Sequence, residues 1–188
     1  MRMAMENFSN KASLDKTRII ASSNNTFNIE LVQHLGNDSA IQIIEISEDL
    51  KKIYGPNSFL NENNIHKYFN EKTLPFIARY QNQIIGFIIG APLEIFNNQG
   101  WVQYDDNLNQ ENTLYTYAFI FKKEFRKKGG FAKTLKKVYN SWAKKRGFQY
   151  ITGHINKRIN LKGDIEIIKE FSNWFDSKEP FIYYRKKI

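Results

Sequence analysis

The sequence of 188 residues contains no cysteine. This absence excludes a disulfide framework, a thiolate metal site and a cysteine nucleophile, and it agrees with a reducing cytoplasm. Long apolar runs are also absent: the longest, from Ile84 to Leu93, contains Gly86, Gly90 and Pro92. A bilayer-spanning helix takes ~20 residues, so we expect no membrane partner. Met1 to Asn10 lacks the apolar core of a secretory signal, and we therefore expect a cytoplasmic protein.

The histidines are few and scattered. His34, His66 and His154 have none of the spacings that are typical of metal ligands, so no metal cofactor is expected. The hydrophobic fraction of 41% and the aromatic fraction of 15% predict a globular chain rather than a disordered one. Its length is sufficient for one domain with a proper core.

Positive charge is in excess, with 28 basic against 19 acidic side chains and a formal net charge of +9. Such an excess is typical of proteins that bind nucleic acid, acidic lipid or a polyanionic cofactor. Lysine is abundant together with asparagine and isoleucine, which indicates a compositional bias, and we ascribe most surface lysines to that bias. The cluster at 126–128 is the exception, and we interpret it as a contact for a polyanionic cofactor.

The order of apolar patterns predicts strands that alternate with helices. Residues 1–26 are polar and are expected to form a poorly ordered lead segment, followed by one domain over 27–188. The expected strands are Phe27–Leu35 at an edge, Ile41–Ile46 as the first core strand, Phe76–Tyr80 and Ile84–Ile89 as a hairpin, Leu114–Phe121, Tyr150–Ile155 and Phe181–Ile188.

Helical spacing and capping residues predict the remaining elements. The expected helices are Ser47–Tyr54 capped by Ser47, Asn61–Lys72 with Ile65, Tyr68 and Phe69 on its apolar face, one from Phe131 to Arg146, and one from Asp164 to Phe175 with Ile165, Ile168, Phe171, Trp174 and Phe175 on its apolar side. Together these elements predict an α/β fold, in which a mixed central sheet of about six to seven strands is flanked by about four helices.

The chain is organised around the stretch from Thr113 to Ile155. Leu114–Phe121 is an unbroken run of aromatic, aliphatic and Thr side chains, which is typical of a central strand covered on both faces. A basic loop follows at once and opens a helix. The apolar stripe of this helix consists of Phe131, Leu135, Val138, Tyr139 and Trp142.

The basic loop contains Arg126, Lys127, Lys128, Gly129 and Gly130. A helix N-terminus carries unpaired N–H groups and partial positive charge, so phosphate binds there readily. The glycines allow a pyrophosphate to approach the backbone, and the three cations add full charges beside it. The pattern is equally typical of a tight loop with a solvated basic face.

In its context, this stretch resembles the acetyl-CoA-binding core of the GNAT family of acyl-CoA N-acyltransferases. The family's signature, Arg/Gln-x-x-Gly-x-Gly/Ala, fits in two registers: from Arg126, with a mismatch at Phe131, or from Lys127, with a mismatch at the first residue. The segments 76–80 and 84–90, Phe-Ile-Ala-Arg-Tyr and Ile-Ile-Gly-Phe-Ile-Ile-Gly, resemble the family's second and third strands. The resemblance implies the family's fold.

For function, the resemblance implies transfer of an acetyl group from the co-substrate acetyl-CoA to a primary amine, by direct attack in a ternary complex. A backbone N–H near Phe121, where the strand separates from its neighbour, would stabilise the oxyanion, and the Phe119–Phe121 backbone would pair with the pantetheine amides. The implied cofactor contacts are Phe119, Ile120, Phe121, Arg126, Lys127, Lys128, Gly129, Gly130, Phe131, Ala132 and Asn156.

Two tyrosines are the catalytic candidates. Tyr115 and Tyr117 are expected on the same strand face as Phe119 and Phe121. Tyrosine is a poor base, but it is a suitable acid for a leaving thiolate. The Tyr-x-x-x-Gly-Phe motif, which carries a general-acid tyrosine in some family members, is absent before the last strand. His154 is interpreted as a structural or solvated residue.

The acceptor is expected to contact the long connection over 91–112, because loops of this length are often functional. The candidate substrate contacts are Glu94, Trp101, Tyr104 and Asp105, an aromatic and acidic set that would suit a cationic amine. These residues are equally typical of a solvated loop that an aromatic side chain pins down. The acceptor is expected to be a small-molecule or peptide amine, and a homodimer is compatible with the sequence.

Two alternatives stay open. Lysine-rich segments with interleaved aromatics such as Tyr139 and Trp142 could form a basic module that binds nucleic acid. Alternatively, the chain could be a family relative that binds CoA and catalyses nothing, because fold alone does not decide activity.

Overall fold

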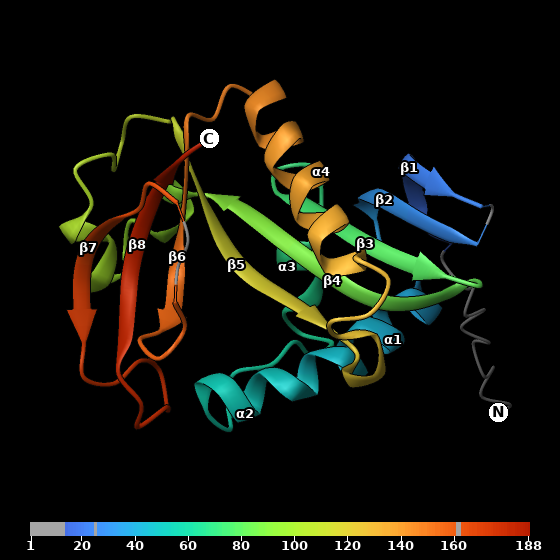
Figure 1. Cartoon of the computed structure of the whole chain (residues 1–188), viewed down its shortest axis with the longest axis horizontal. Coiled ribbons are helices and arrows are strands. Elements are labelled where there is room, and N and C mark those ends of the chain that lie inside the picture. The colour runs from blue at the N-terminus through green and yellow to red at the C-terminus, as the bar shows by residue number, and fades with distance from the viewer. Residues whose placement is uncertain (1–13, 25, 161–162) are drawn as a thin grey trace, which may run out of the picture.

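A computed structural model describes residues 14–24, 26–160 and 163–188, and one eight-stranded sheet runs through them (Figure 1). The strand order is β1-β2-β3-β4-β5-β6-β8-β7, and neighbours are antiparallel except β5 and β6. The strands are β1 Lys16–Ser23, β2 Phe27–His34, β3 Leu74–Tyr80, β4 Gln83–Pro92, β5 Thr113–Phe121, β6 Tyr150–Asn156, β7 Glu166–Phe171 and β8 Phe181–Lys187. The mixed α/β sheet is confirmed, with more strands than expected.

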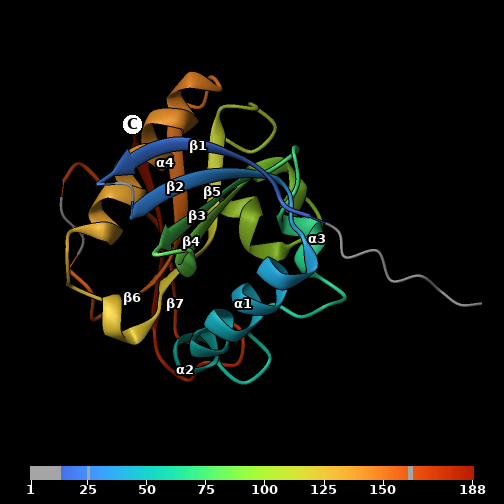
Figure 2. The same cartoon turned by 90° about the vertical axis from the view of Figure 1, so that its right-hand side faces the viewer.

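Helices cover both faces of the sheet (Figure 2). The longest, α4 (Phe131–Lys145), packs Leu135, Tyr139 and Ala143 against one face. The other face is covered by α1 (Asn37–Ser47), α2 (Lys51–Tyr54) and α3 (Ile65–Tyr68). The apolar stripe predicted for α4 and the central position of β5 are thereby confirmed.

The hairpin of β3 and β4 is also confirmed. Its two-residue turn places both Gln81 (φ 47°) and Asn82 (φ 64°) in the left-handed region, which is the pattern of a type I′ turn. Such a turn matches the twist of the flanking strands, so it fixes the register of the two buried strands.

The first core strand expected over Ile41–Ile46 is wrong, because this segment lies within helix α1. The buried residues of α1 are Ser39, Ala40, Ile43, Ile46 and Ser47, which is helical spacing. Isoleucine favours strands only weakly, and packing against the sheet outweighs that preference.

The expected cap at Ser47 is wrong for the same reason, since α1 continues through a 3₁₀ turn into α2 without a break. The Ser47 hydroxyl instead donates to the Ile44 carbonyl and accepts the N–H of Leu60. Gly55, with φ 101°, follows the last residue of α2, so the expected end of the helix at Tyr54 is confirmed.

The second helix is much shorter than predicted, one turn from Ile65 to Tyr68. Its expected apolar face of Ile65, Tyr68 and Phe69 is nevertheless buried.

The helix expected over Asp164–Phe175 is also wrong. Residues 166–171 form the edge strand β7, paired with β8, and between β6 and β7 the described residues 157–160 and 163–165 contain no helix. Only one side of β7 is partly buried, through Ile168 and Phe171, so the apolar positions fitted a helix and an edge strand equally well.

At the N-terminal end, residues 16–23 are ordered as β1, which corrects the expectation of a poorly ordered segment over 1–26; residues 1–13 lie outside the described part. Because β1 pairs with β2, the strand β2 is not at the edge of the sheet.

Candidate active site between two diverging strands

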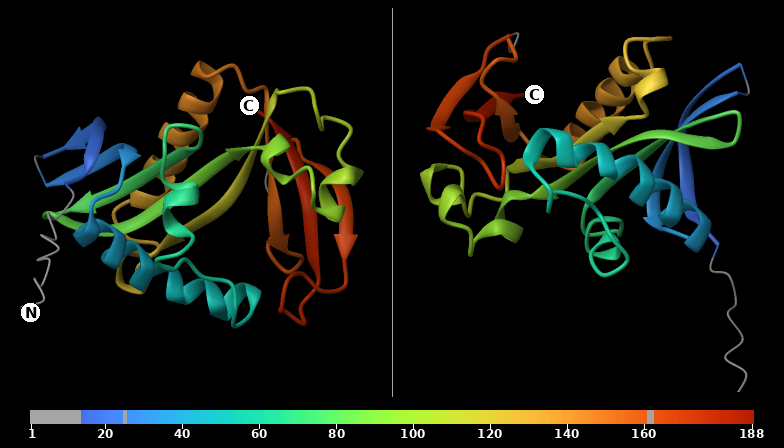
Figure 3. Two further views of the ribbon diagram at one scale, coloured as in Figure 1. Left: turned by 180° about the vertical axis from the view of Figure 1, so that it is seen from behind. Right: turned by 90° about the horizontal axis from the view of Figure 1, so that it is seen from below.

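The parallel strands β5 and β6 pair only at their beginnings. The paired residues are Thr113–Tyr115 and Tyr150–Thr152, and beyond them the two strands diverge (Figures 1 and 3). The separation therefore begins after Tyr115, not near Phe121 as the sequence had suggested. From Thr116 onward, one edge of β5 is left without a partner strand.

Backbone groups on this open edge can be assigned from the neighbouring contacts. The N–H of Lys122 bonds to the carbonyl of Ile85 in β4, so Lys122 and Ile120 point their backbone groups toward β4. Phe119 and Phe121, which alternate with them, point theirs to the open edge. The open edge can accept a strand-like ligand at Phe119.

A β-bulge changes the direction of the side chains in β5. Gly90 opposes Thr116 and Ile89 opposes Ala118, so Tyr117 is the extra residue. Tyr115 and Tyr117 consequently lie on the α1–α3 side of the sheet.

Phe119 and Phe121 pack with α4 on the opposite side. The expectation that all four side chains share one face is therefore wrong, because strict alternation does not hold across a bulge.

The loop before α4 has the conformation of an anion-binding turn. Lys127 (φ 62°), Gly129 (φ 57°) and Gly130 (φ 66°) are left-handed, and the amides of Lys127 to Gly130 donate no hydrogen bond to any described residue. A Cβ added to Gly130 would meet no atom within 4 Å. The loop thus presents free N–H groups beside the exposed side chains of Lys127 and Lys128.

Arg126, by contrast, does not extend into the loop's free space. Its Nε donates to the Phe121 carbonyl at 2.8 Å, and its terminal nitrogen lies 2.6 Å from Asp49. Arg126 therefore ties the end of β5 to the helical layer and takes up one carbonyl of the open edge.

Asn156, the remaining expected cofactor contact, turns into its own loop, where its Oδ1 accepts the N–H of Arg158. Of the expected cofactor residues, the fold brings together Phe119, on the open edge of β5, and the segment 127–132 at the start of α4.

Two pockets open on the other side of β5. The first, of ≈ 110 Å³, lies against α2 and the segment after it, and is bordered by Tyr54, Asn57 and His154 among others. The second, of ≈ 280 Å³, lies against α3 and the connection after β4. Both share the side chains of Tyr115, Tyr117, Trp174 and Phe175.

A buried hydrogen bond joins β5 to β6 at the first pocket. The hydroxyl of Tyr115 lies 3.0 Å from Nδ1 of His154. The imidazole is stacked between Trp174 and Tyr183, at centroid distances of 3.4 and 4.7 Å, and its Nε2 is buried without a partner among the described residues.

Burial fixes the protonation states of this pair. It lowers the pKa of His154 to about 2, so the imidazole is neutral at physiological pH. Burial also raises the pKa of Tyr115 well above its usual value, so the hydroxyl keeps its proton. The Tyr115 hydroxyl can therefore donate a hydrogen bond, and at neutral pH neither member of the pair is a suitable base.

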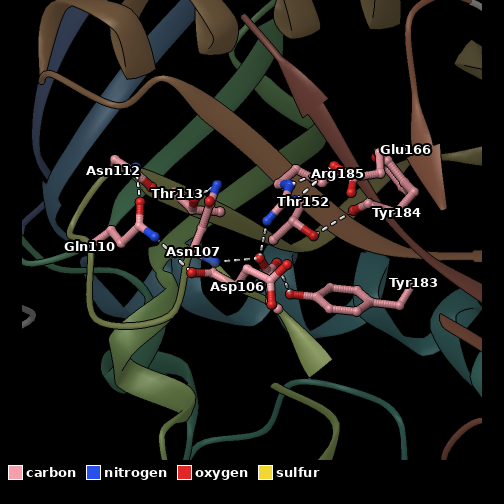
Figure 4. A network of polar contacts seen from close by, with 11 residues as sticks. Asp106, Asn107, Gln110, Asn112, Thr113, Thr152, Glu166, Tyr183, Tyr184 and Arg185 are labelled. Atoms are coloured by element: carbon pink, nitrogen blue, oxygen red, sulfur yellow. Dashed lines mark hydrogen bonds and ion pairs between the residues drawn. The ribbon is translucent and has the colours of Figure 1, made fainter. Parts of the chain in front are cut away.

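Asp105 is not available to a substrate. It is 3% exposed, its carboxylate lies 2.5 Å from the Arg185 guanidinium, and it accepts the Tyr183 hydroxyl at 2.7 Å. Figure 4 shows the surrounding network, in which Arg185 also binds Glu166 of β7. The acid thus pins the long connection to β8, which is a structural role rather than the acceptor contact that the sequence suggested.

Of the other expected acceptor residues, only Trp101 lines a pocket, where it packs on Tyr115 at 4.8 Å. Glu94 accepts the N–H of Glu111 within the connection. Tyr104 is half exposed and lies against Phe171 and Lys169, outside both pockets.

The sequence interpretation missed Trp174 and Phe175 as pocket residues, because it placed both on the apolar side of a helix. It also interpreted His154 as structural or solvated. No local pattern distinguishes a pocket wall from core at these positions. Trp174 and Phe175 are a lone aromatic pair before a Pro-containing segment, and His154 is a histidine at a strand end. Only the fold reveals their role.

Within the described ranges, no helix is both long and apolar enough to cross a membrane. No protein-family model matches the sequence, and no curated protein matches it.

Solved structures do resemble the fold. Ribosomal-protein-alanine N-acetyltransferase from Brucella melitensis aligns over 85% of this chain and 99% of its own, with 13% identity and a TM-score of 0.59. An aminoglycoside 6'-N-acetyltransferase complexed with coenzyme A aligns over 85% and 96%, with 12% identity and a TM-score of 0.59.

The GNAT domain of S. lividans PAT aligns over 93% of this chain and 97% of its own, with 12% identity and a TM-score of 0.58. The chain therefore has the GNAT fold, as its sequence had suggested.

Proposed function

We propose that the protein is an N-acetyltransferase that moves an acetyl group from acetyl-CoA to a primary amine. One observation carries this proposal: the open edge of β5 leads into the loop of free amides at the start of α4, and the pockets adjoin the same strand from the opposite side of the sheet. A thioester laid along β5 would thus meet an acceptor from the other side. A solved structure of similar fold contains coenzyme A, which supports the assignment.

In this proposal, the pantetheine amides pair with the backbone of Phe119, as an added strand would. The pyrophosphate binds the free N–H groups of 127–130 at the N-terminus of α4, where the helix dipole and the charges of Lys127 and Lys128 favour an anion. Arg126 contributes indirectly, because it holds the end of β5 in place through Asp49.

The reaction is a direct attack within the ternary complex. The amine nitrogen forms a bond to the thioester carbonyl carbon, and the bond from that carbon to sulfur breaks. Positioning of the two reactants supplies a large part of the rate. The backbone N–H at the Tyr117 bulge is our candidate donor to the oxyanion.

Proton transfers complete the reaction. Tyr115, held by His154, donates a hydrogen bond to the leaving thiolate. The proton that the attacking nitrogen releases passes through water to the sulfur, because no described residue that lines the pockets is a suitable base.

The nucleic-acid alternative is less well supported. Tyr139 is 1% exposed and packs in the core, and Trp142 lies against Phe76 at 6.4 Å. The ring of Tyr139 is therefore not presented for stacking with bases, and the ring of Trp142 is partly buried against the core. The alternative of a relative without catalytic activity is addressed by measuring turnover as well as binding.

The proposal is tested by calorimetric titration with acetyl-CoA and, separately, with a mixed single-stranded oligonucleotide at two salt concentrations. We expect saturable one-site binding of acetyl-CoA. Salt-sensitive oligonucleotide binding without acetyl-CoA binding would overturn the proposal. Turnover is followed by reaction of released CoA with dithiobis-nitrobenzoate, which gives no background from a protein without cysteine. Binding of acetyl-CoA without thiol release for any amine would establish the inactive alternative.

A further inference from the structure

Aromatic rings form much of the walls of the two pockets. Four of them border both pockets: Phe175, Trp174, Tyr115 and Tyr117. The second pocket adds the rings of Phe96, Trp101 and Tyr68, beside Lys67, Ile95, Asn98 and Gln99. Phe96 packs on Trp101 at 5.5 Å. Such rings offer flat apolar faces that prefer another ring, in offset or edge-to-face contact.

The described walls of the two pockets contain no negative charge that could compensate a polycation. Among the described residues no carboxylate side chain lines either pocket, and Lys67 is the one charged side chain there. Asp176, which follows Phe175, accepts the backbone and side-chain N–H groups of Asn57 at 3.3 and 2.9 Å. A polyamine or an aminoglycoside carries several charges that need compensation when they leave water, and this site offers none.

The volume of the second pocket suits one ring. It measures ≈ 280 Å³, whereas an apolar cavity of about 150 Å³ already accommodates benzene. The first pocket, of ≈ 110 Å³, adjoins it at the hydroxyl-bearing ring of Tyr115. The two volumes therefore leave room for a ring and for the short chain that joins it to an amino group.

Phe175 lies at the junction of the pockets in an unusual conformation. It is 65% exposed, and its φ is 51°. It is the first central residue of a turn that the Ser177 N–H closes on the Trp174 carbonyl at 3.0 Å, a position that commonly takes glycine when φ is positive. A bulky residue held in this way costs stability, and such strain gathers at ligand clamps.

We propose that the acceptor is a primary amine carried on a flat aromatic ring. The ring stacks against Phe175, Trp101 and Phe96. The amino group lies beside the Tyr115 hydroxyl, next to the open edge of β5. This inference rests on the proposed acetyl transfer, and it makes Phe175 a residue that determines specificity.

The test uses the full chain saturated with CoA, after the acetyl-CoA titration described above. Calorimetry measures the binding of 2-phenylethylamine, with n-butylamine, spermidine and kanamycin as probes that lack a ring or carry several charges. We expect the aryl amine to bind roughly tenfold more tightly than each of the others, because only it gains ring contacts. Thiol release should rank the four amines in the same order.

The matched variants are Phe175→Ala and Tyr104→Ala. Both remove an exposed ring, but only Phe175 borders the pockets. Phe175→Ala should weaken 2-phenylethylamine binding roughly fivefold and leave acetyl-CoA binding unchanged, whereas Tyr104→Ala should change neither. Equal affinities for the aryl amine and n-butylamine, or a preference for spermidine or kanamycin, would overturn the inference while acetyl-CoA binding stands. Failure of acetyl-CoA to bind would overturn the proposed function and this inference together.

Discussion

The Tyr115 hydroxyl and His154 Nδ1 lie 3.0 Å apart, where β5 and β6 stop pairing. Both side chains are almost completely buried. The stacking of His154 between Trp174 and Tyr183 fixes the imidazole, and the imidazole in turn fixes the hydroxyl at the border of both pockets. The pair therefore orients a hydrogen-bond donor at the point where the proposed thioester and amine meet.

The first prediction concerns Tyr115→Phe. Phenylalanine fills the same space but cannot donate to the leaving thiolate, so we expect kcat with 2-phenylethylamine to fall by about 10²-fold. The KM for acetyl-CoA should stay nearly constant, because no cofactor contact is lost. Thiol release measured at saturating acetyl-CoA checks this. Tyr104→Phe, which removes an exposed hydroxyl outside the pockets, is the control, and equal kcat in the two variants would exclude Tyr115 from the reaction.

The second prediction concerns stability at acid pH. His154 is neutral in the fold with a pKa of about 2, whereas an unfolded histidine has a pKa of about 6.5. Below pH 6.5 the unfolded chain therefore binds a proton that the folded chain does not, and the free energy of unfolding must fall as the pH falls. Between pH 6.5 and 4.5, this one group should cost about 2 kcal/mol.

Urea unfolding of the wild type and of His154→Asn at several pH values isolates that contribution. Asparagine retains a hydrogen-bonding group toward Tyr115 but does not titrate. The variant should be less stable at pH 7, since it loses the stacking on Trp174, and its stability should vary less steeply between pH 6.5 and 4.5. Parallel pH profiles of the two proteins would show that His154 is not held neutral.

The third prediction concerns the loop before α4. Gly130 is left-handed and a side chain there would point into open space, a conformation that Asp and Asn tolerate better than other residues. Gly130→Asp places a negative charge beside the free amides, so acetyl-CoA should bind at least roughly tenfold more weakly than to the wild type. Gly130→Asn, which has the same size without the charge, should bind clearly more tightly than Gly130→Asp. Equal calorimetric affinities of the two variants for acetyl-CoA would show that its phosphates do not bind this loop.

Local patterns were sufficient for the elements that bind the cofactor in our proposal. The continuous apolar run of Leu114–Phe121 and the stripe from Phe131 to Trp142 each correspond to a single regular element, because a buried strand and an amphipathic helix have distinct periods. The hairpin turn at Gln81 and Asn82 likewise has its own chemistry.

Contacts between distant segments decided the rest. The isoleucines of 41–46 fit a strand by preference and a helix by packing, and β7 is a strand because β8 lies beside it. The bulge at Tyr117 has no residue signature, yet it determines which tyrosines reach the pockets. Arg126 was expected to contact phosphate. Its actual partner, Asp49, lies 77 residues away in the sequence, so no local pattern predicts the pair.

The last prediction concerns the pairing of Asp105 with Arg185. Asp105→Asn keeps an acceptor for the Tyr183 hydroxyl, but among the described residues it leaves the guanidinium of Arg185 with Glu166 alone as a charged partner. Because the side chain of Arg185 is 11% exposed, the lost charge is poorly replaced by water, and breaking such a pair should cost about 3 kcal/mol of unfolding free energy.

Asp106→Asn is the matched control, because the carboxylate of Asp106, next to Asp105 in the sequence, is exposed. The unfolding free energy of this variant should stay within about 0.5 kcal/mol of the wild-type value. Chemical denaturation of both variants measures the difference. The acetyl-CoA affinity of Asp105→Asn, measured where it is folded, should match that of the wild type, because the network pins the connection to β8 and lies away from the loop before α4. If Asp105→Asn instead bound the acceptor amine more weakly without loss of unfolding free energy, Asp105 would be an acceptor contact.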